Sequence, residues 1–454
     1  MKFKYSLWLL SVVLMLAGRG AHAQGEFSLW LQHLRTEAML SGISDETALE
    51  AVNHIQFLPD VIALDRSQPE FISPFLEYYQ KRVNAQKLQN GQQLLAEHAQ
   101  MLNQIEAQYG VSKFALIAFW GMETQYGRNQ GKLDVLSSLA TLAYEGRRTD
   151  FFRGQLLDAM RMIDNRHVTI DALKGSWAGA YGNMQFMPTT FMLYAVDGDS
   201  DGNIDVANSL PDAFASAANY LSQIGWRSHE PVMLEVQLPE SFDWSSAQLN
   251  IRKPIQAWSK LGVRALHLDA GVPSFIQTIK PKAVRHKVTS KKVAKKSVNK
   301  LSNQPSSTVT PTVRTVNLDM LALDVKGPAA ILLPQGYRGP AFMVFDNFDV
   351  IMDWNRSVNY ALSVAQMAEQ LQYETKRIVG GQAAEDGALS FSEMLDLQSI
   401  LNMRGFIAGE PDGLPGFKTQ QALREYQLAN KLPADGYASR SIYQRIYAEH
   451  YQKP

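Results

Sequence analysis

Apolar residues recur every three to four positions through most of the first half of the chain, which is the period of an amphipathic helix. The segments with this pattern are Phe27–Met39, Asp45–Ile55, Phe71–Gln86, Leu88–Tyr109, Val135–Glu145, Phe151–Asp164 and Pro211–Ile224. Alternation typical of strands is confined to Val232–Leu238, Ala329–Pro334 and Ala341–Phe345, and a helical pattern returns over Ser357–Leu371. The patterning predicts an α+β fold that is mostly helical, with a small β portion.

A second helical region begins near Ser390, after a break at Gly380-Gly-Gln-Ala-Ala-Glu-Asp-Gly387. Leu397, Leu401 and Phe406 fit one apolar helix face, and Asp-Gly pairs further on mark turns. With 454 residues the chain has room for two or three domains. We therefore expect residues 388–450 to fold as a small, separate helical module.

The first 23 residues have the features of a secretory signal peptide. Lys2 and Lys4 precede the apolar run Leu7–Leu16, and Ala21-His-Ala23 supplies small residues for cleavage near Ala23. The apolar run is too short to cross a bilayer comfortably, so we expect no stable membrane span after cleavage. The chain contains no cysteine, which excludes disulfides and a lipid-modified N-terminal cysteine. The sequence predicts export to the periplasm.

Charge is balanced overall but unevenly distributed. The formal net charge is zero, and loss of Lys2, Lys4 and Arg19 with the signal leaves a mildly acidic chain, which gives no support for nucleic-acid binding. Lys280–Lys300 is basic and lacks acidic residues, and the polar stretch that follows has few large apolar groups. Such a composition predicts a disordered insert over residues 280–315. The insert either attracts anionic polymers and headgroups or is simply solvated.

One carboxylate stands at the end of a continuously apolar segment, Phe114-Ala-Leu-Ile-Ala-Phe-Trp-Gly-Met-Glu-Thr-Gln-Tyr-Gly127. Ser112 suits the start of a helix and Gly127 its end, which places Glu123 in the last turn of a helix buried on all sides. Poor solvation raises the pKa of a carboxyl, as a general acid working near neutral pH requires. The alternative is a glutamate at a helix end that points into solvent.

A second candidate is Ser176-Trp-Ala-Gly-Ala-Tyr-Gly-Asn-Met-Gln-Phe-Met-Pro-Thr-Thr-Phe191, rich in small, aromatic and amide residues. Its glycines permit close approach of backbone to a ligand. Hydrogen-bonding side chains such as Ser176 and Gln185, next to flat aromatic faces, suit a sugar. The alternative is a glycine-rich loop that caps a helix beginning at Pro188.

A third candidate is the acidic loop Asp197-Gly-Asp-Ser-Asp-Gly-Asn-Ile-Asp205, which matches the start of an EF-hand calcium loop. The loop departs from that pattern at position 12, where Asn208 replaces the usual Glu. Asp212 is placed to supply the missing carboxylate. The expected ligands of a structural Ca²⁺ are Asp197, Asp199, Asp201, Asn203, Asp205 and Asp212. The alternative is an acidic turn without metal.

These motifs occur in the order found in a known family. The chain resembles the lytic murein transglycosylases of the B type, glycoside hydrolase family 103, which are lysozyme-like. The motifs that carry the resemblance are Gly121-Met-Glu-Thr-Gln-Tyr-Gly127, Ser176 through Pro188, the acidic loop, Ala218-Asn-Tyr-Leu221 and Asp353-Trp-Asn-Arg-Ser-Val-Asn-Tyr-Ala361. They span most of a catalytic domain over residues 24–375. The basic insert is longer than the family leads us to expect.

The resemblance implies cleavage of the β-1,4 bond between N-acetylmuramic acid and N-acetylglucosamine in peptidoglycan, with formation of a 1,6-anhydromuramic acid end. Glu123 would act first as acid and then as base, without a cofactor for catalysis. This accounts for a single carboxylate where a conventional glycosidase uses two, since Asp134 and Glu145 fit helix caps or surface positions better. The sugar cleft implied by the resemblance is lined by Ser176, Gln185, Tyr220, Asn355 and Tyr360.

The tail resembles the three-helix peptidoglycan-binding domain of type 1, through Leu397 to Phe406, Asp412-Gly413, Glu425-Tyr-Gln427 and Leu432-Pro-Ala-Asp-Gly436. Such a module would hold a monomeric enzyme on insoluble glycan strands; a helical cap that only stabilises the fold is the alternative for it. Two other functions remain open for the whole chain. One is a hydrolytic muramidase, in which water attacks, and the other is a non-catalytic wall-binding protein.

Overall fold

A computed structural model describes residues 25–66, 73–268, 313–321, 323, 325–373, 378–380 and 387–451. The predicted signal peptide and the predicted insert up to residue 312 lie outside these residues. The described chain divides into two compact units. The first contains the residues up to Ser228 together with Asp349–Gln372, and the second contains His229–Phe348 and the residues from Tyr373 onward.

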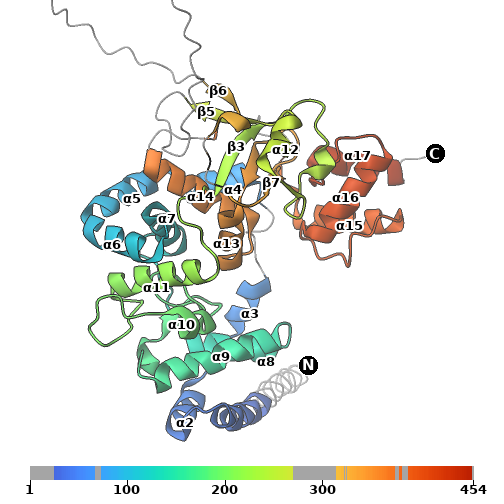
Figure 1. The fold of residues 1–454 in the computed structure, drawn as a ribbon. Helices are drawn as coiled ribbons and strands as arrows, with labels where there is room; N and C mark the ends of the chain where they lie inside the picture. Colours follow the sequence, from blue (N-terminus) through green and yellow to red (C-terminus); the bar gives the residue numbers. More distant parts are fainter. Residues whose placement is uncertain are drawn as a thin grey trace, which may run out of the picture. The chain divides into compact units, whose positions relative to one another are not determined.

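The first unit is helical (Figure 1). Its helices are residues 25–40, α2 (Asp45–His54), α3 (Pro59–Arg66), α4 (Phe75–Arg82), α5 (Ala85–Glu97), α6 (Ala99–Tyr109), α7 (Lys113–Thr124), α8 (Val135–Glu145), α9 (Thr149–Asp164), η2 (Ile170–Ala172), α10 (Pro188–Tyr194), α11 (Leu210–Gln223) and most of α14 (Val358–Tyr373). The short strands β1 (Leu133–Asp134) and β2 (Lys174–Gly175) pair antiparallel. Helix α7 packs against α5, α6 and α11, and α8 packs against α9.

Helix boundaries in the first unit correct two sequence predictions. The segments Phe71–Gln86 and Leu88–Tyr109 do not form two continuous helices. The helix is interrupted near Val83 and again at His98, which gives α4, α5 and α6. Asn84 explains the first break, since its side chain accepts a hydrogen bond from the N–H of Lys87 at 2.9 Å and so caps the start of α5. By contrast, α8 begins and ends at the predicted residues.

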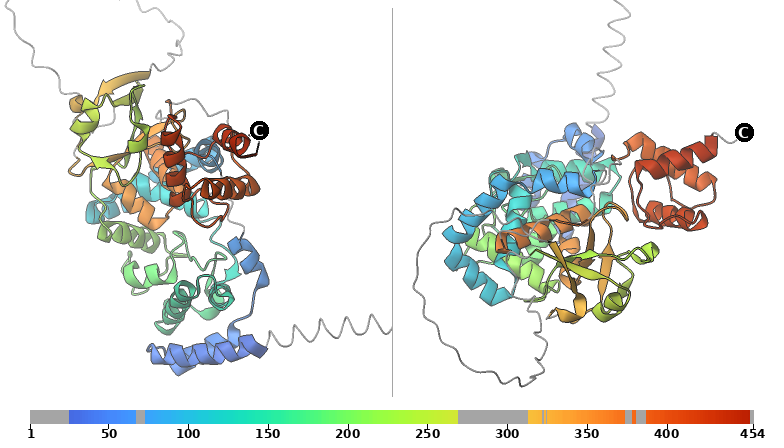
Figure 2. Two further views of the ribbon diagram at one scale, coloured as in Figure 1. Left: turned by 90° about the vertical axis from the view of Figure 1, so that its right-hand side faces the viewer. Right: turned by 90° about the horizontal axis from the view of Figure 1, so that it is seen from above.

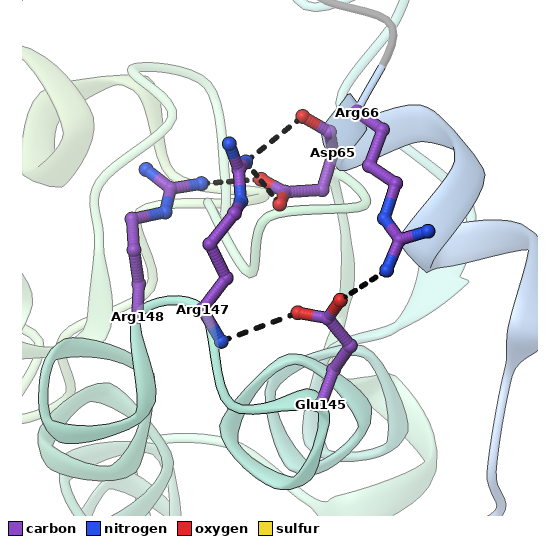
Figure 3. Close-up of polar contacts among 5 residues, drawn as sticks. All are labelled: Asp65, Arg66, Glu145, Arg147 and Arg148. Atoms are coloured by element: carbon purple, nitrogen blue, oxygen red, sulfur yellow. Dashed lines mark hydrogen bonds and ion pairs between the residues drawn. The ribbon is translucent and has the colours of Figure 1, made fainter. Parts of the chain in front are cut away.

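A charged cluster joins the end of α3 to the turn between α8 and α9 (Figure 3). Asp65 is buried and forms ion pairs with both Arg147 and Arg148, and Arg147 also donates to the Asp65 carbonyl at 3.0 Å. Next to it, Arg66 pairs with Glu145 at 2.5 Å. That bond from Arg66 lowers the pKa of Glu145. Two separate stretches of the unit are thus joined by charge-assisted hydrogen bonds.

The second unit contains a six-stranded antiparallel sheet in the order β4-β7-β8-β3-β5-β6. Its strands and helices are β3 (Met233–Gln237), η3 (Trp244–Ser246), β4 (Arg252–Lys253), α12 (Ile255–Lys260), β5 (Arg264–Leu268), β6 (Val313–Asn317), η4 (Leu318–Met320), β7 (Ala329–Leu332) and β8 (Ala341–Val344). Helix α13 (Asp346–Trp354) begins in this unit and ends in the first. The sheet core is built around Trp258, whose Nε1 donates to the Ala329 carbonyl at 2.8 Å.

The sheet corrects the predicted end of the basic insert. Val313 to Thr315 were expected within the insert over 280–315, but they pair with Leu266 to Leu268 as part of β6. The edge strand β6 has a polar sequence, Val-Arg-Thr-Val-Asn, and it follows directly on the polar stretch. Composition alone does not separate such a strand from a linker, because its pairing partner lies elsewhere in the sequence.

The residues from Leu389 form a three-helix core with α15 (Phe391–Met403), α16 (Phe417–Ala429) and α17 (Arg440–Tyr451), drawn in red in Figure 2. Two buried glutamines tie down its Asp-Gly turns. Gln398 Oε1 accepts from the N–H of Gly413 at 2.9 Å, and Gln427 Oε1 accepts from the N–H of Gly436 at 2.8 Å. No helix among the described residues has the length and apolar character needed to cross a bilayer.

Candidate active site

Helix α7 carries Glu123 in its last turn, as the sequence predicts. The helix ends at Thr124, however, and not next to Gly127. Gln125, Tyr126 and Gly127 follow with φ values of 52°, 63° and 78°, so three successive residues adopt a left-handed conformation. Such backbone is strained for residues other than glycine. We call residues 121–127 the hook; they comprise the end of α7 with Glu123 and the three left-handed residues that follow.

Two aromatic residues hold the Glu123 carboxylate. Trp354 Nε1, at the end of α13, donates to Glu123 Oε1 at 2.9 Å. The hydroxyl of Tyr360, in the first turn of α14, donates to the same oxygen. The residues before Glu123, from Ala115 to Met122, are buried, while Glu123 itself is partly buried. The alternative of a glutamate that points freely into solvent does not fit these contacts.

An aromatic wall surrounds the carboxylate. The Trp354 ring lies 4.5 Å from Phe119, 5.5 Å from Phe186 and 5.3 Å from Tyr220, centroid to centroid. Tyr220 in turn lies 4.6 Å from Tyr194. Burial raises the pKa of the Tyr220 hydroxyl, with smaller contributions from Tyr194 and Asp353. Among these rings Trp354 and Tyr220 are only partly buried, and they place neutral aromatic faces next to an acidic group, an arrangement suited to the apolar face of a sugar.

Asn183 connects the hook to the glycine-rich loop. Its Oδ1 accepts from Trp120 Nε1 at 2.9 Å, its carbonyl accepts from Thr124 Oγ1 at 2.8 Å, and its Nδ2 donates to the Ala207 carbonyl at 2.8 Å. A Cβ at position 127 would lie 2.7 Å from Asn183 Oδ1, so only glycine at this position leaves room for the Asn183 side chain. From the sequence, Asn183 counts with Ser176 and Gln185 among the neutral donors and acceptors for a sugar, but its side chain is engaged with Trp120 and Ala207. Its central position arises from partners far away in the sequence.

The predicted substrate residues fall into two groups. Tyr360 contacts Glu123, Tyr220 lies against Trp354, and Asn355 directly follows Trp354 and is partly buried. Ser176 and Gln185 instead make contacts within and around the glycine-rich loop. Ser176 Oγ accepts from the N–H of Ala180 at 3.0 Å, and Gln185 Nε2 donates to the carbonyls of Gln130 and Gly182, each at 3.0 Å.

The acidic loop gathers three of its five predicted carboxylate ligands. Asp197, Asp199 and Asp212 each place a carboxylate oxygen within 4.8 Å of the other two. Asp212 is buried at the start of α11, where its two oxygens accept from the N–H groups of Gly198 and Asp205, each at 2.7 Å. An oxygen-only donor set of this kind suits Ca²⁺. Asp212 therefore lies close enough to Asp197 and Asp199 to share a cation with them.

The other two predicted carboxylate ligands, Asp201 and Asp205, accept hydrogen bonds from other parts of the loop. Asp205 accepts from Asn208 Nδ2 at 2.9 Å, and Asp201 Oδ1 accepts from the N–H of Asn203 at 2.8 Å. Among the described residues, the carboxylates of Asp201 and Asp205 are outside the three-residue group. Asn208, at the position where an EF-hand carries Glu, is thus engaged with Asp205.

The two other carboxylates considered from the sequence have structural partners. Asp134 caps α8 by accepting from the N–H of Ser137 at 2.8 Å, and it also contacts His54 and Lys174. Burial opposes ionisation of Asp134, but these hydrogen bonds outweigh it and lower its pKa. Glu145 pairs with Arg66. Both groups act as caps or ion-pair partners, as expected.

A helical domain with a carboxylate at a helix end and an aromatic wall beside it defines the lysozyme-like transglycosylase class. The profile of the transglycosylase SLT domain matches residues 26–284 and 277–369, and a putative peptidoglycan binding domain matches residues 392–446. The chain belongs to the transglycosylase SLT domain family and is an enzyme of that class.

Individual relatives agree with this assignment. The chain is 37% identical to membrane-bound lytic murein transglycosylase B of Escherichia coli over 153 residues, which is 34% of this chain and 42% of that protein. SltB3 of Pseudomonas aeruginosa in complex with NAG-NAM-pentapeptide is 37% identical, with a TM-score of 0.76 over 92% of this chain and 99% of that chain. The SltB3 complex with NAG-anhNAM-pentapeptide gives a TM-score of 0.77 at 37% identity over 93% and 99%.

Proposed function

We propose that this enzyme cleaves the β-1,4 bond between N-acetylmuramic acid and N-acetylglucosamine in peptidoglycan and leaves a 1,6-anhydromuramic acid end. The observation that carries the proposal is the Glu123 carboxyl, held by Trp354 and Tyr360 against an aromatic wall. The sugar-containing ligands of SltB3 support the substrate class, and its anhydro-sugar complex supports the product.

Glu123 exchanges one proton with the substrate in each direction. As an acid it donates a proton to the glycosidic oxygen, which leaves as the 4-hydroxyl of N-acetylglucosamine while the bond to muramic acid C1 breaks. As a carboxylate it then accepts the proton of the muramic acid C6 hydroxyl, whose oxygen forms the new bond to C1. Glu123 ends the cycle protonated, no water is consumed, and one carboxyl is sufficient.

The surrounding residues orient the sugar and the acid. The Trp354 N–H and the Tyr360 hydroxyl fix one carboxylate oxygen, so the other is directed toward the reacting bond. Tyr220 and Trp354 offer stacking faces to the sugar rings. Asn355, Ser176 and Gln185 supply polar contacts at the edge of the sugars. The two hydrogen bonds that the side-chain amide of Gln185 donates hold this side chain in one orientation.

A structural calcium ion fits the acidic loop. Asp197, Asp199 and Asp212 bring three carboxylates together, and their mutual repulsion is relieved by a divalent cation. The ion would join the loop to the start of α11 and takes no part in proton transfer.

Export and wall binding complete the proposal. The first 23 residues are a signal peptide, and the mature enzyme works in the periplasm as a monomer. The module with α15 to α17, which matches a peptidoglycan-binding domain, holds it on the wall and raises the effective concentration of substrate. Deletion of residues 388–454 should weaken sedimentation with peptidoglycan and spare cleavage of short soluble glycans.

The deciding experiment is mass spectrometry of the products from purified peptidoglycan, with the wild-type enzyme and Glu123→Gln side by side. Muropeptides that end in 1,6-anhydromuramic acid, absent from the variant digest, support the proposal. Products with reducing ends and one added water would instead make the protein a hydrolytic muramidase. Binding to peptidoglycan without products would indicate a non-catalytic wall-binding protein.

A further inference from the structure

The hook carries Glu123, so its backbone conformation determines the orientation of this side chain. Contacts from neighbouring residues are needed to maintain that conformation. Gln125 and Tyr126 both have positive φ, a conformation that persists in such residues only when surrounding contacts impose it. Some of these contacts are within the hook, where the N–H of Gly127 donates to Thr124 Oγ1 at 3.0 Å. Others come from α5, on a different part of the chain.

The end of α7 leaves one carbonyl for an outside donor. The N–H groups of Gln125 and Tyr126 both donate to the Trp120 carbonyl, in place of the regular pattern in which Gln125 would bond Gly121. Lys87 Nζ donates to the Gly121 carbonyl at 2.9 Å. The ammonium therefore lies at the carboxyl-terminal end of α7, where the helix dipole favours a positive charge.

A second bond runs in the opposite direction. The Tyr126 hydroxyl donates to the Lys87 carbonyl at 2.8 Å, so Lys87 and the hook each donate to the other. The Tyr126 ring lies directly against both helices. A Cβ on Gly121 would meet Tyr126 Cε1 at 2.9 Å, and one on Gly91 in α5 would meet the Tyr126 hydroxyl at 2.6 Å. Two glycines thus permit the close approach that joins α5 to the hook.

The position of Lys87 is unfavourable for its own helix. It is the third residue of α5, where the helix dipole disfavours a cation. Burial, with a smaller contribution from the nearby Arg82, lowers the pKa of Lys87 to about 8. The stability of α5 therefore does not account for a lysine here. The contact with α7 does.

We propose that Lys87 is a positioning residue for Glu123: its ammonium group holds the Gly121 carbonyl and so fixes the hook on which the acid is carried. This inference rests on the proposed role of Glu123. Lys87 acts two residues away through the backbone and does not touch the substrate. A small displacement of a catalytic group from its reacting geometry costs a large factor in rate.

The kinetic test compares Lys87→Met, which keeps the length of the side chain, with Lys87→Arg, which restores a cationic donor. Lys81→Met, on exposed α4, is the matched control. Lys87→Met should lower kcat about 10- to 100-fold and change KM less than about two-fold, while Lys87→Arg recovers most of kcat. An unchanged kcat in Lys87→Met, or an equal loss in both Lys87 variants, would overturn the proposal.

Amide hydrogen exchange gives a readout that does not depend on activity. Exchange over residues 121–127 should accelerate in Lys87→Met but not in Lys87→Arg or Lys81→Met. Unchanged exchange in Lys87→Met rejects the inference whatever the activity. If exchange accelerates in Lys87→Met but the wild-type enzyme cleaves no peptidoglycan, the contact between Lys87 and the hook is supported and the proposed function is rejected. Should Lys87→Met fail to fold, Tyr126→Phe removes only the reciprocal bond and should show the same effects more weakly.

Discussion

Trp354 Nε1 and Glu123 Oε1 lie 2.9 Å apart, although 231 residues separate them in the sequence. The contact joins the end of α13 to the end of α7, and Tyr360 adds a second donor to the same oxygen from α14. Two neutral donors of this kind orient a carboxylate without forming an ion pair with it. Both donors fix the position of Oε1 and therefore the orientation of the Glu123 carboxylate.

Removal of either donor should slow catalysis without loss of the fold. Trp354→Phe and Tyr360→Phe each retain an aromatic ring but lose one hydrogen bond to Glu123, and each should lower kcat about ten-fold. Steady-state kinetics on soluble glycan strands measures the effect. Tyr447→Phe, at an exposed tyrosine of α17, is the control and should retain wild-type kcat. A Tyr360→Phe enzyme with normal kcat would show that this bond does not matter.

Calcium should stabilise the protein through the acidic loop. The Tm of the wild type should rise with added Ca²⁺, because a ligand that binds only the folded state stabilises it by mass action. Asp199→Ala should abolish that rise, since Asp199 is one of the three grouped carboxylates. Asp171→Ala, an exposed acid elsewhere, should keep it.

Asp212→Ala provides a second distinction. Because Asp212 also accepts two backbone hydrogen bonds, this variant should have a lower Tm both with and without calcium. Differential scanning fluorimetry in Ca²⁺ and in chelator measures all four proteins. If the wild-type Tm is the same in Ca²⁺ and in chelator, the proposed metal site is wrong.

The charged cluster around Asp65 should contribute measurably to stability. Asp65→Asn leaves Arg147 and Arg148 without their shared anion and should lower the free energy of unfolding by about 2 kcal/mol, less than for a fully buried pair because both arginines are partly exposed. Arg66→Gln breaks the neighbouring pair with Glu145, in which the arginine side chain is 66% exposed, and should cost under about 0.5 kcal/mol. Urea unfolding of the two variants compares them. Equal losses would contradict the assigned difference in burial.

The helical module should lose stability in acid through Glu393. Its bonds to Arg440, with further bonds from Ser390, lower the pKa of Glu393 to about 2, below the ordinary value of 4.5. Because the folded-state pKa is depressed, the stabilisation is complete above the ordinary pKa and is lost as the pH falls toward the folded value. Glu393→Gln should therefore lower the Tm of the module at pH 6 but make little difference near pH 2. Calorimetry at both pH values checks this, and a difference that stays constant with pH would contradict it.

Local patterns in the sequence were sufficient for much of this protein. The helical period predicts the bounds of α8 and predicts those of α11 to within one residue at each end. This is possible because the apolar residues that these helices bury recur in the sequence at helical spacing. The apolar run before Glu123 likewise predicts a helix with an acid in its last turn. The motifs and their order indicate the family. The Asp-Gly pairs of the tail predict turns between its helices.

Only the tertiary structure decided which side chains meet. Trp354 and Lys87 both act on the end of α7. Trp354 follows Glu123 by 231 residues and Lys87 precedes Gly121 by 34, and no local pattern relates either to Glu123. The hook also depends on distant contacts, since left-handed Gln125 and Tyr126 contradict their own conformational preferences. The sequence pointed to Asp212 as a ligand of the acidic loop, but only the folded loop separates Asp201 and Asp205 from the grouped carboxylates. Local preference determines the elements of this enzyme, whereas packing between remote segments determines the surroundings of its acid.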